Sequence, residues 1–217
     1  MKKAVLLFVF SLALSGAIDA QMIKASPFEG RWVWDGEGED DMTERMTELF
    51  FFGNIMLSMY GEIPLYKGNV FTYTNRVIRL DNDILQYRLD GNTLTITDED
   101  EQFTYTKVKT TKSPLEGLWK MTADSGRSSE VKDDEFMLFV ADIMAISGGQ
   151  GGYFGYKIDF NGRQFRPSLI CIQFMRERRG KTVSEEELKE MTMEYSLSGK
   201  TLTITFGNEK ASLTRVY

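Results

Sequence analysis

The sequence predicts an all-β fold of two tandem small antiparallel up-and-down β-barrels, with a short helix inserted in the second. Two observations carry this prediction. The same two sequence blocks occur twice in the same order, and the later block alternates apolar and polar side chains with the period of a β-strand. A chain of 217 residues is long enough for two small domains.

The repeat is visible in two pairs of matching segments. Residues 26–32 (SPFEGRW) return as residues 113–119 (SPLEGLW), 87 positions later. Residues 87–97 return as residues 195–205, 108 positions later. The second copy therefore contains 21 additional residues between the two segments.

The ends of the two copies also match, since residues 105–108 (YTKV) correspond to residues 213–216 (LTRV). These matched ends predict one domain over residues 26–110 and a second over residues 113–217. We assign part of the additional length to a glycine-rich loop at residues 148–152. Another part is a helix predicted from about Glu185 to Met191, because Ser184 and Glu187 form a capping box.

Strand alternation is clearest in residues 93–97, where Leu94 and Ile96 share one face and threonines occupy the other. A glycine two residues before this segment, Gly91, predicts a hairpin turn, and Gly199 does the same in the second copy. The side chains that this alternation assigns to the barrel interiors are Phe71, Tyr73, Tyr87, Leu89, Leu94, Ile96, Phe103, Tyr105, Ile170, Ile172, Phe174, Tyr195, Leu197, Leu202 and Ile204.

Closure into a barrel follows from the size of each copy. About 85 residues in short strands bury one face of a sheet only if the sheet curls, and closure removes exposed edges. A helix over residues 41–50 is an alternative, since Met42, Met46 and Leu49 have helical spacing. The matching segment 135–140 has the pattern of a strand, which favours a strand in the first copy as well.

The first twenty residues have the features of an export signal. Lys2 and Lys3 precede an apolar run over residues 4–14 and a segment of small residues that ends at Ala20. We expect cleavage after Ala20, with Ala17 as the second choice. The expected location is periplasmic or secreted, without stable membrane insertion, because no later apolar stretch has the length of a membrane span.

Composition excludes several classes of chemistry. The net charge of -6 and the pI near 4.9 argue against binding to nucleic acid. The absence of histidine removes the usual imidazole base and nearly every zinc site. Carboxylates are abundant, so composition alone leaves a pair of acidic catalytic groups open. We expect no enzyme, no catalytic residue, no cofactor and no metal.

The remaining polar motifs favour structural interpretations. The acidic segments 35–41 and 98–101 lack the pattern of a calcium loop and are expected to be solvated turns. Arg176, Arg178, Arg179 and Lys181 either solvate a turn or bind an acidic partner or lipid headgroups. Cys171, the only cysteine, cannot form an intramolecular disulfide and is expected to be a small buried thiol rather than a reactive one.

The segments Gly30-Arg31-Trp32 and Gly117-Leu118-Trp119 resemble the Gly-x-Trp opening strand of lipocalins and other calycins. The later blocks are similar to the final hairpin of short bacterial lipocalin-like domains. This resemblance implies that each tryptophan packs beneath a basic side chain of the last strand. The implied structural pairs are Trp32 with Lys107 and Trp119 with Arg215.

The resemblance also implies a function. The leading hypothesis is an exported non-enzymatic protein that binds a small lipophilic ligand. The alternative is a protein interaction or structural module of the cell envelope, with barrels filled by their own side chains and no ligand. No feature of the sequence identifies a protein partner.

Overall fold

The computed structural model describes residues 25–36, 46–61, 65–80, 83–98, 101–125, 135–147, 152–172 and 190–217. The described chain forms two compact units that meet in sequence between Thr111 and Lys112. We refer to them as the N-terminal barrel and the C-terminal barrel. Among the described residues, no helix is long and apolar enough to cross a membrane.

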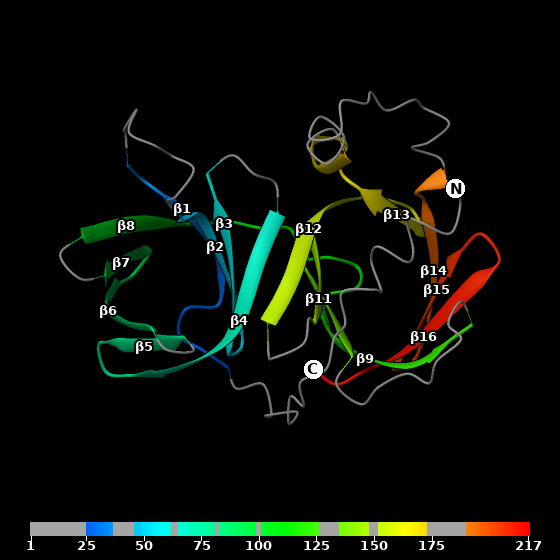
Figure 1. The fold of residues 1–217 in the computed structure, drawn as a ribbon, viewed down its shortest axis with the longest axis horizontal. Helices are drawn as coiled ribbons and strands as arrows, with labels where there is room; N and C mark the ends of the chain where they lie inside the picture. Colours follow the sequence, from blue (N-terminus) through cyan, green and yellow to red (C-terminus); the bar gives the residue numbers. More distant parts are fainter. Residues whose placement is uncertain are drawn as a thin grey trace. The chain divides into compact units, whose positions relative to one another are not determined.

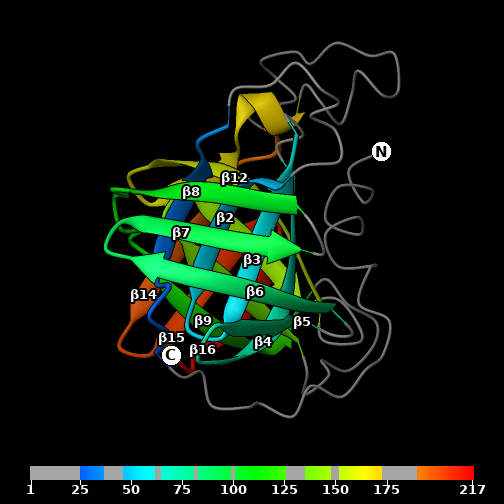
Figure 2. The same cartoon turned by 90° about the vertical axis from the view of Figure 1, so that its left-hand side faces the viewer.

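The N-terminal barrel contains eight strands. They are β1 (Gly30–Trp34), β2 (Met46–Phe52), β3 (Ile55–Tyr60), β4 (Leu65–Thr74), β5 (Val77–Leu80), β6 (Asp83–Asp90), β7 (Thr93–Asp98) and β8 (Glu101–Val108). Each strand pairs antiparallel with the next, and β8 returns to pair with β1. Figure 2 shows β6, β7 and β8 side by side with alternating directions. The sheet is therefore closed and has no free edge.

The C-terminal barrel repeats this order (Figure 1). Its strands are β9 (Gly117–Asp124), β10 (Phe136–Val140), β11 (Ile143–Ser147), β12 (Gly152–Asn161), β13 (Gln164–Pro167), β14 (Met193–Ser198), β15 (Thr201–Phe206) and β16 (Glu209–Arg215). Neighbours pair antiparallel, and β16 closes onto β9. The predicted all-β barrel fold is confirmed.

The turn that opens the N-terminal barrel explains the recurring sequence SPxEG. Ser26 Oγ accepts a hydrogen bond from the Phe28 N–H at 3.1 Å, and Glu29 Oε1 accepts one from the Ser26 N–H at 3.4 Å. This is a capping box around a single turn. Glu29 Oε1 also accepts from the N–H of Gly53, at 2.6 Å, in the β2–β3 hairpin turn. One carboxylate therefore joins the opening turn to a hairpin.

The C-terminal barrel has the same arrangement. Ser113 Oγ accepts from the Leu115 N–H at 3.0 Å, and Glu116 Oε2 accepts from the Ser113 N–H at 3.1 Å. Glu116 Oε2 accepts a further hydrogen bond from Ala141, at 3.0 Å, in the β10–β11 turn. The repeat thus preserves a three-dimensional junction as well as a sequence.

The strand boundaries locate the additional residues of the second copy. β12 and β13 begin and end 87 residues after β4 and β5, whereas β15 begins and ends 108 residues after β7. All 21 extra residues therefore lie between β13 and β14. Our assignment of part of this length to residues 148–152 is wrong, because the connections before β4 and β12 have equal length.

The alternation of Ile170, Ile172 and Phe174 predicts a strand at the start of the insertion, and this prediction is wrong for residues 169–172. Residues 169–172 are helical, and the Ile172 N–H donates to Ser168 O at 3.1 Å. Proline at position 167 ends β13, and the short apolar run that follows fits a helix as well as a strand. Ile170 is 62% exposed and does not line the barrel, whereas Ile172 is buried. Phe174 lies outside the described residues.

Two other predictions concern helices. The alternative of a helix over residues 41–50 is wrong from Met46 onward, because this part belongs to β2; residues 41–45 lie outside the described chain. Aromatic residues at the end of β2 and the turn at Gly53 favour a hairpin. The helix predicted at residues 185–191 falls largely outside the described residues, where only Glu190 is seen as helical and Met191 as a turn.

We expect Ala141→Gly to raise the free energy of unfolding by about 0.5 to 1 kcal/mol. Ala141 has a φ of 49°, in the left-handed region, whereas the equivalent turn residue of the N-terminal barrel is Gly53 with a φ of 58°. Urea denaturation of the full chain measures the change. Gly53→Ala is the matched control and should lower stability; a destabilised Ala141→Gly variant would contradict the assignment of strain to this turn.

Candidate functional site

Trp32 is the buried centre of the closed end of the N-terminal barrel, by which we mean the end that carries the opening turn. Its indole N–H donates to Phe28 O at 2.6 Å, and Lys107 Nζ lies 5.1 Å from the ring centroid. Gly30 has a φ of 114°, and a side chain there would approach Lys107 Cε to 3.2 Å. The Gly-x-Trp motif therefore leaves room for the basic side chain above the indole.

Trp119 has the same surroundings in the C-terminal barrel. Its indole N–H donates to Leu115 O at 2.8 Å, and Arg215 Cζ lies 4.7 Å from the ring centroid. Arg215 also donates from Nη2 to the carbonyl oxygen of Glu116, at 2.6 Å. The structure thus brings together both tryptophan and basic pairs that the resemblance implied. The contacts of both pairs are those of a structural anchor.

Aromatic rings fill the N-terminal barrel next to this anchor. The Phe28 ring lies 4.8 Å from Tyr87, 5.2 Å from Phe51 and 5.5 Å from Tyr73, measured between centroids. Phe51 is in turn 5.4 Å from Phe71. The C-terminal barrel has a smaller cluster, Phe139, Phe160, Phe165 and Tyr195, with centroid distances of 5.7 to 6.3 Å. The closed ends are plugged by side chains.

The predicted lining residues fall into three groups. Those that the structure buries are Phe71, Leu94, Ile96, Tyr105, Ile172, Leu202 and Ile204. Those that are half-buried are Tyr87, Leu89, Phe103 and Tyr195. Tyr73, Leu197 and Ile170 remain 38%, 44% and 62% exposed, and the fifteenth residue, Phe174, lies outside the described chain. Sequence reasoning missed Leu49, Phe51 and Met56, which lie in or beside apolar runs without alternation and therefore gave no indication of which face is interior.

The opposite end of the N-terminal barrel, which we call the open end, carries apolar side chains that are partly exposed. Trp34, Met46 and Phe103 pack against the core there but stay partly exposed. Trp34 pairs with Tyr105 across β1 and β8, and the Tyr105 hydroxyl donates to Met46 O at 3.1 Å. Trp34 shares the face of Trp32, so strand alternation alone would have identified it. These residues form an accessible apolar wall.

Polar side chains face this wall from β3 and β4. Ser58 pairs with interior Leu49, Lys67 pairs with Ser58, and Asn69 pairs with interior Met56. Because side chains at paired positions lie on the same face of a sheet, all three polar residues are on the interior face. Ser58 is only 5% exposed, whereas Lys67 is exposed at the mouth. We call Ser58, Lys67 and Asn69 the polar strip.

The C-terminal barrel lacks the polar strip. The positions equivalent to Ser58, Lys67 and Asn69 in the strand register are Ile146, Phe154 and Tyr156. The insertion of this barrel also contributes two buried residues, Cys171 and Ile172. The internal repeat therefore provides a comparison in which the same interior positions are polar in one barrel and apolar or aromatic in the other.

Cys171 has the environment of a structural thiol. It is fully buried, and Ser168 Oγ donates to its sulfur at 3.2 Å. Burial raises the pKa of the Cys171 thiol above its ordinary value, although the hydrogen bond from Ser168 acts in the opposite direction. Burial likewise raises the pKa of the Tyr156 hydroxyl, with a contribution from Cys171. A thiol that stays protonated at neutral pH is a poor nucleophile.

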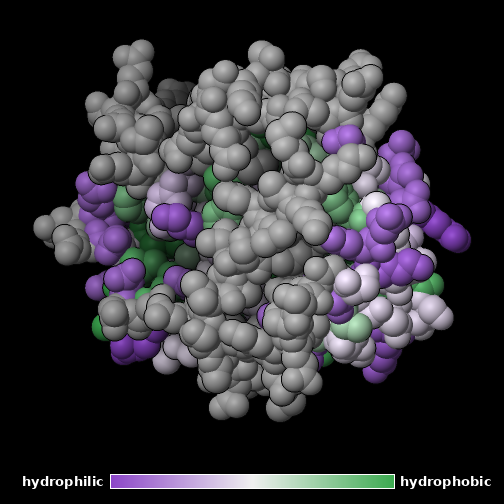
Figure 3. Space-filling view, turned by 45° about the vertical axis from the view of Figure 1, so that its right-hand side comes forward, coloured by the Kyte–Doolittle hydropathy of each residue, from purple (hydrophilic) through white to green (hydrophobic). Residues whose placement is uncertain are grey.

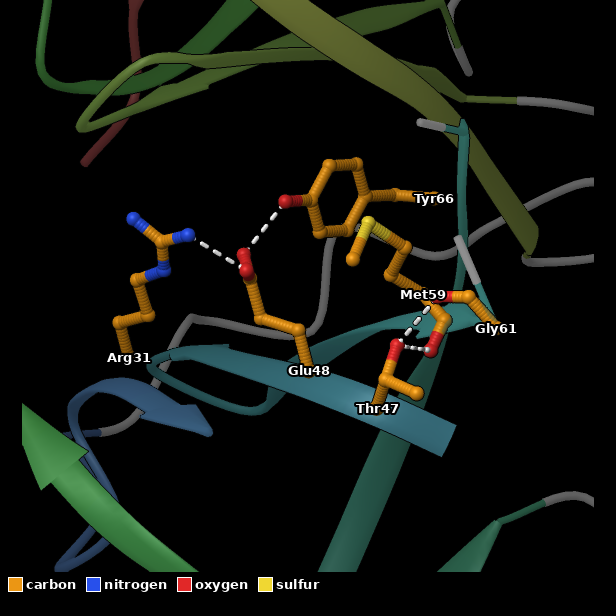
Figure 4. A network of polar contacts seen from close by, with 6 residues as sticks. All are labelled: Arg31, Thr47, Glu48, Met59, Gly61 and Tyr66. Carbon is orange, nitrogen blue, oxygen red and sulfur yellow. Dashed lines mark hydrogen bonds and ion pairs between the residues drawn. The ribbon is translucent and has the colours of Figure 1, made fainter. Parts of the chain in front are cut away.

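A buried ion pair lies on the outward face of the N-terminal barrel (Figure 4). Arg31 Nη2 donates to Glu48 Oε2 at 2.5 Å, and the Tyr66 hydroxyl donates to the other carboxylate oxygen. Arg31 alternates with interior Trp32 and therefore points away from the core. The equivalent residues of the C-terminal barrel are Leu118, Phe136 and Tyr153, so the charges are exclusive to one copy.

Of the other predicted motifs, one lies at a hairpin tip and three fall wholly or partly outside the described residues. Asp98 and Glu101 are exposed and pair at the ends of β7 and β8, as expected for a hairpin tip. The basic run at Arg176 to Lys181, residues 37–41 of the acidic loop and residues 148–151 of the glycine-rich segment are outside the described chain. No group of three or more acidic, cysteine or histidine residues that could hold a metal occurs among the described residues.

No known family model matches the chain, and no curated protein matches it. The structure is similar at a low level to the DNA polymerase sliding clamp of Pseudomonas aeruginosa, with 8% identity and a TM-score of 0.21. It is also similar to a chain described as a DNA polymerase III beta subunit of Eubacterium rectale, with 8% identity and a TM-score of 0.19. The matches cover 89% and 94% of this chain but 59% of each matched chain. Likenesses of this strength carry no argument about function.

We expect Arg31→Leu to lower the free energy of unfolding by about 2 kcal/mol, because it removes the Arg31 cation from the buried Glu48 carboxylate. The 24% exposure of Arg31 moderates this cost. The double variant Arg31→Leu with Glu48→Phe, which copies the C-terminal barrel, should recover most of the loss. Urea denaturation of both variants tests this; a double variant less stable than the single one would contradict it.

We expect Arg215→Ala to lower the melting temperature and the free energy of unfolding by about 1 kcal/mol, because it removes the cation over Trp119. The hydrogen bond to Glu116 is lost as well. Lys107→Ala is the parallel test in the N-terminal barrel. Thermal melts followed by circular dichroism provide the measurement, and unchanged melting would show that the ring contact contributes nothing to stability.

Proposed function

We propose that this chain is an exported, non-enzymatic, lipocalin-like protein whose N-terminal barrel binds a small lipophilic ligand at its open end. The observation that carries the proposal is the wall formed by Trp34, Met46 and Phe103, which is packed on the core yet partly exposed. Apolar and aromatic side chains make up most of the lining of ligand sites.

The proposed site is shallow. The aromatic plug around Phe28 occupies the closed end, so a ligand can enter only as far as the layer of Leu49 and Tyr105. The ligand would lie across the barrel mouth, in contact with Trp34 and Phe103. The C-terminal barrel, with Phe154 and Tyr156 at the equivalent interior positions, has a structural role in this proposal.

A second candidate function is a protein interaction or structural module of the cell envelope. The observation that favours it is the aromatic filling of both closed ends, because small barrels filled by their own side chains leave little room for a ligand. Figure 3 shows apolar surface set back between hydrophilic residues in the left-hand part of the view, and such surface suits a protein partner as well as a lipophile.

Two measurements separate the candidates. Native mass spectrometry of protein purified from its source should detect a bound lipophile, and the mass of the chain should show loss of residues 1–20. Titration of the purified protein with a fluorescent fatty acid and with a retinoid should show saturable binding. If neither experiment reveals a lipophile, the interaction module is the remaining candidate.

Mutations locate the site. Trp34→Ala should weaken binding of the probe about tenfold, since truncation of an aromatic contact commonly costs more than 1 kcal/mol. Phe154→Ala, at the open end of the C-terminal barrel, is the matched control and should leave affinity unchanged. Equal losses in the two variants would place the site elsewhere.

A further inference from the structure

The polar strip points to the chemistry of the ligand. We infer that the open end of the N-terminal barrel binds an anionic amphiphile, with its charged head at Lys67 and its apolar tail over Trp34 and Phe103. This inference rests on the proposed function and adds the class of ligand. The juxtaposition that carries it is a polar strip on β3 and β4 and an apolar wall on β1, β2 and β8 of one barrel.

Polar side chains on the inner face of a barrel lower its stability unless they serve another purpose, because burial of polar groups is unfavourable. Ser58 is 5% exposed, and its hydroxyl donates to Lys67 O at 3.2 Å. The C-terminal barrel demonstrates that the fold accepts Ile146, Phe154 and Tyr156 at these three positions. The fold therefore does not require the polar strip, which favours a role in recognition.

Lys67 supplies the charge. Lysine occurs at two interior positions in the described part of the N-terminal barrel, Lys67 and Lys107, and Lys107 is held over Trp32 at the closed end. Among the described residues, no carboxylate forms an ion pair with Lys67. Its exposure at the mouth makes it accessible to a ligand. A carboxylate or similar head would form a charge-assisted hydrogen bond with this ammonium group.

The acidic residues at the same end restrict the orientation of the ligand. Asp83, Asp98 and Glu101 are exposed on the interior-facing register of β6, β7 and β8. They would repel an anion placed over those strands, and Lys67 on β4 would attract it. The head is therefore directed toward β4, while the apolar tail can cross to Trp34 on β1.

The test compares three probes of equal chain length, laurate, dodecanol and dodecyltrimethylammonium, by calorimetric titration of the full mature protein at low and high salt. Laurate should bind at least tenfold more tightly than dodecanol, and salt should reduce this difference. Lys67→Met should weaken laurate binding about tenfold and leave dodecanol binding unchanged. Lys109→Met, which removes an exposed lysine beyond the end of β8, should affect neither.

The outcomes distinguish the two proposals. If none of the three probes binds, the proposed lipophile site itself fails. If dodecanol binds as tightly as laurate, and Lys67→Met changes the affinity for neither probe, the site exists but the inferred preference for an anionic head group is wrong. Preference for dodecyltrimethylammonium would also overturn the inference and would assign head recognition to the acidic residues. Retained dodecanol binding by Lys67→Met shows that the variant is folded.

Discussion

One carboxylate in each copy holds the closed end of the barrel together. Glu29 and Glu116 each complete a capping box with a serine three residues earlier and then accept a hydrogen bond from a hairpin turn about 24 residues later in sequence. The turn places Phe28 or Leu115 so that its carbonyl accepts the indole N–H of the following tryptophan. The junction thus connects the opening turn, the first hairpin and the buried tryptophan over which the basic side chain lies.

The junction also explains why the two copies could diverge at one end and not at the other. At the closed end, Gly117 leaves no room for a side chain, because a Cβ there would approach Tyr217 O to 2.5 Å. At the open end the described residues differ between the two copies. The insertion between β13 and β14, the polar strip and the half-exposed wall of Trp34 are all found there. Divergence in function is therefore expected at the open ends.

The outward ion pair of Arg31 and Glu48 shows a second kind of divergence. Its counterparts Leu118 and Phe136 are apolar, and both Glu48 and Phe136 are buried. A buried ion pair gains less from charge attraction than it loses in hydration unless further hydrogen bonds support it. Tyr66 provides such a hydrogen bond. The pair lies on the outward face of β1 and β2 and the polar strip on the interior face of β3 and β4, so their contributions can be altered independently.

The sequence by itself determined the tandem repeat and the all-β class, because these depend on local alternation and on segments that occur twice. The pairing of each tryptophan with a basic residue came from the resemblance to lipocalins, and the structure brings both pairs together. The sequence analysis did not include Trp34, although its position two residues beyond Trp32 places it on the same face of β1. The inward direction of Ser58, Lys67 and Asn69 was decided by the register between β2, β3 and β4, which no single strand contains. Tertiary structure likewise decided the helical turn at Cys171 and the position of the insertion. A short apolar run is compatible with either secondary structure, and only the surrounding strands define where the extra residues begin.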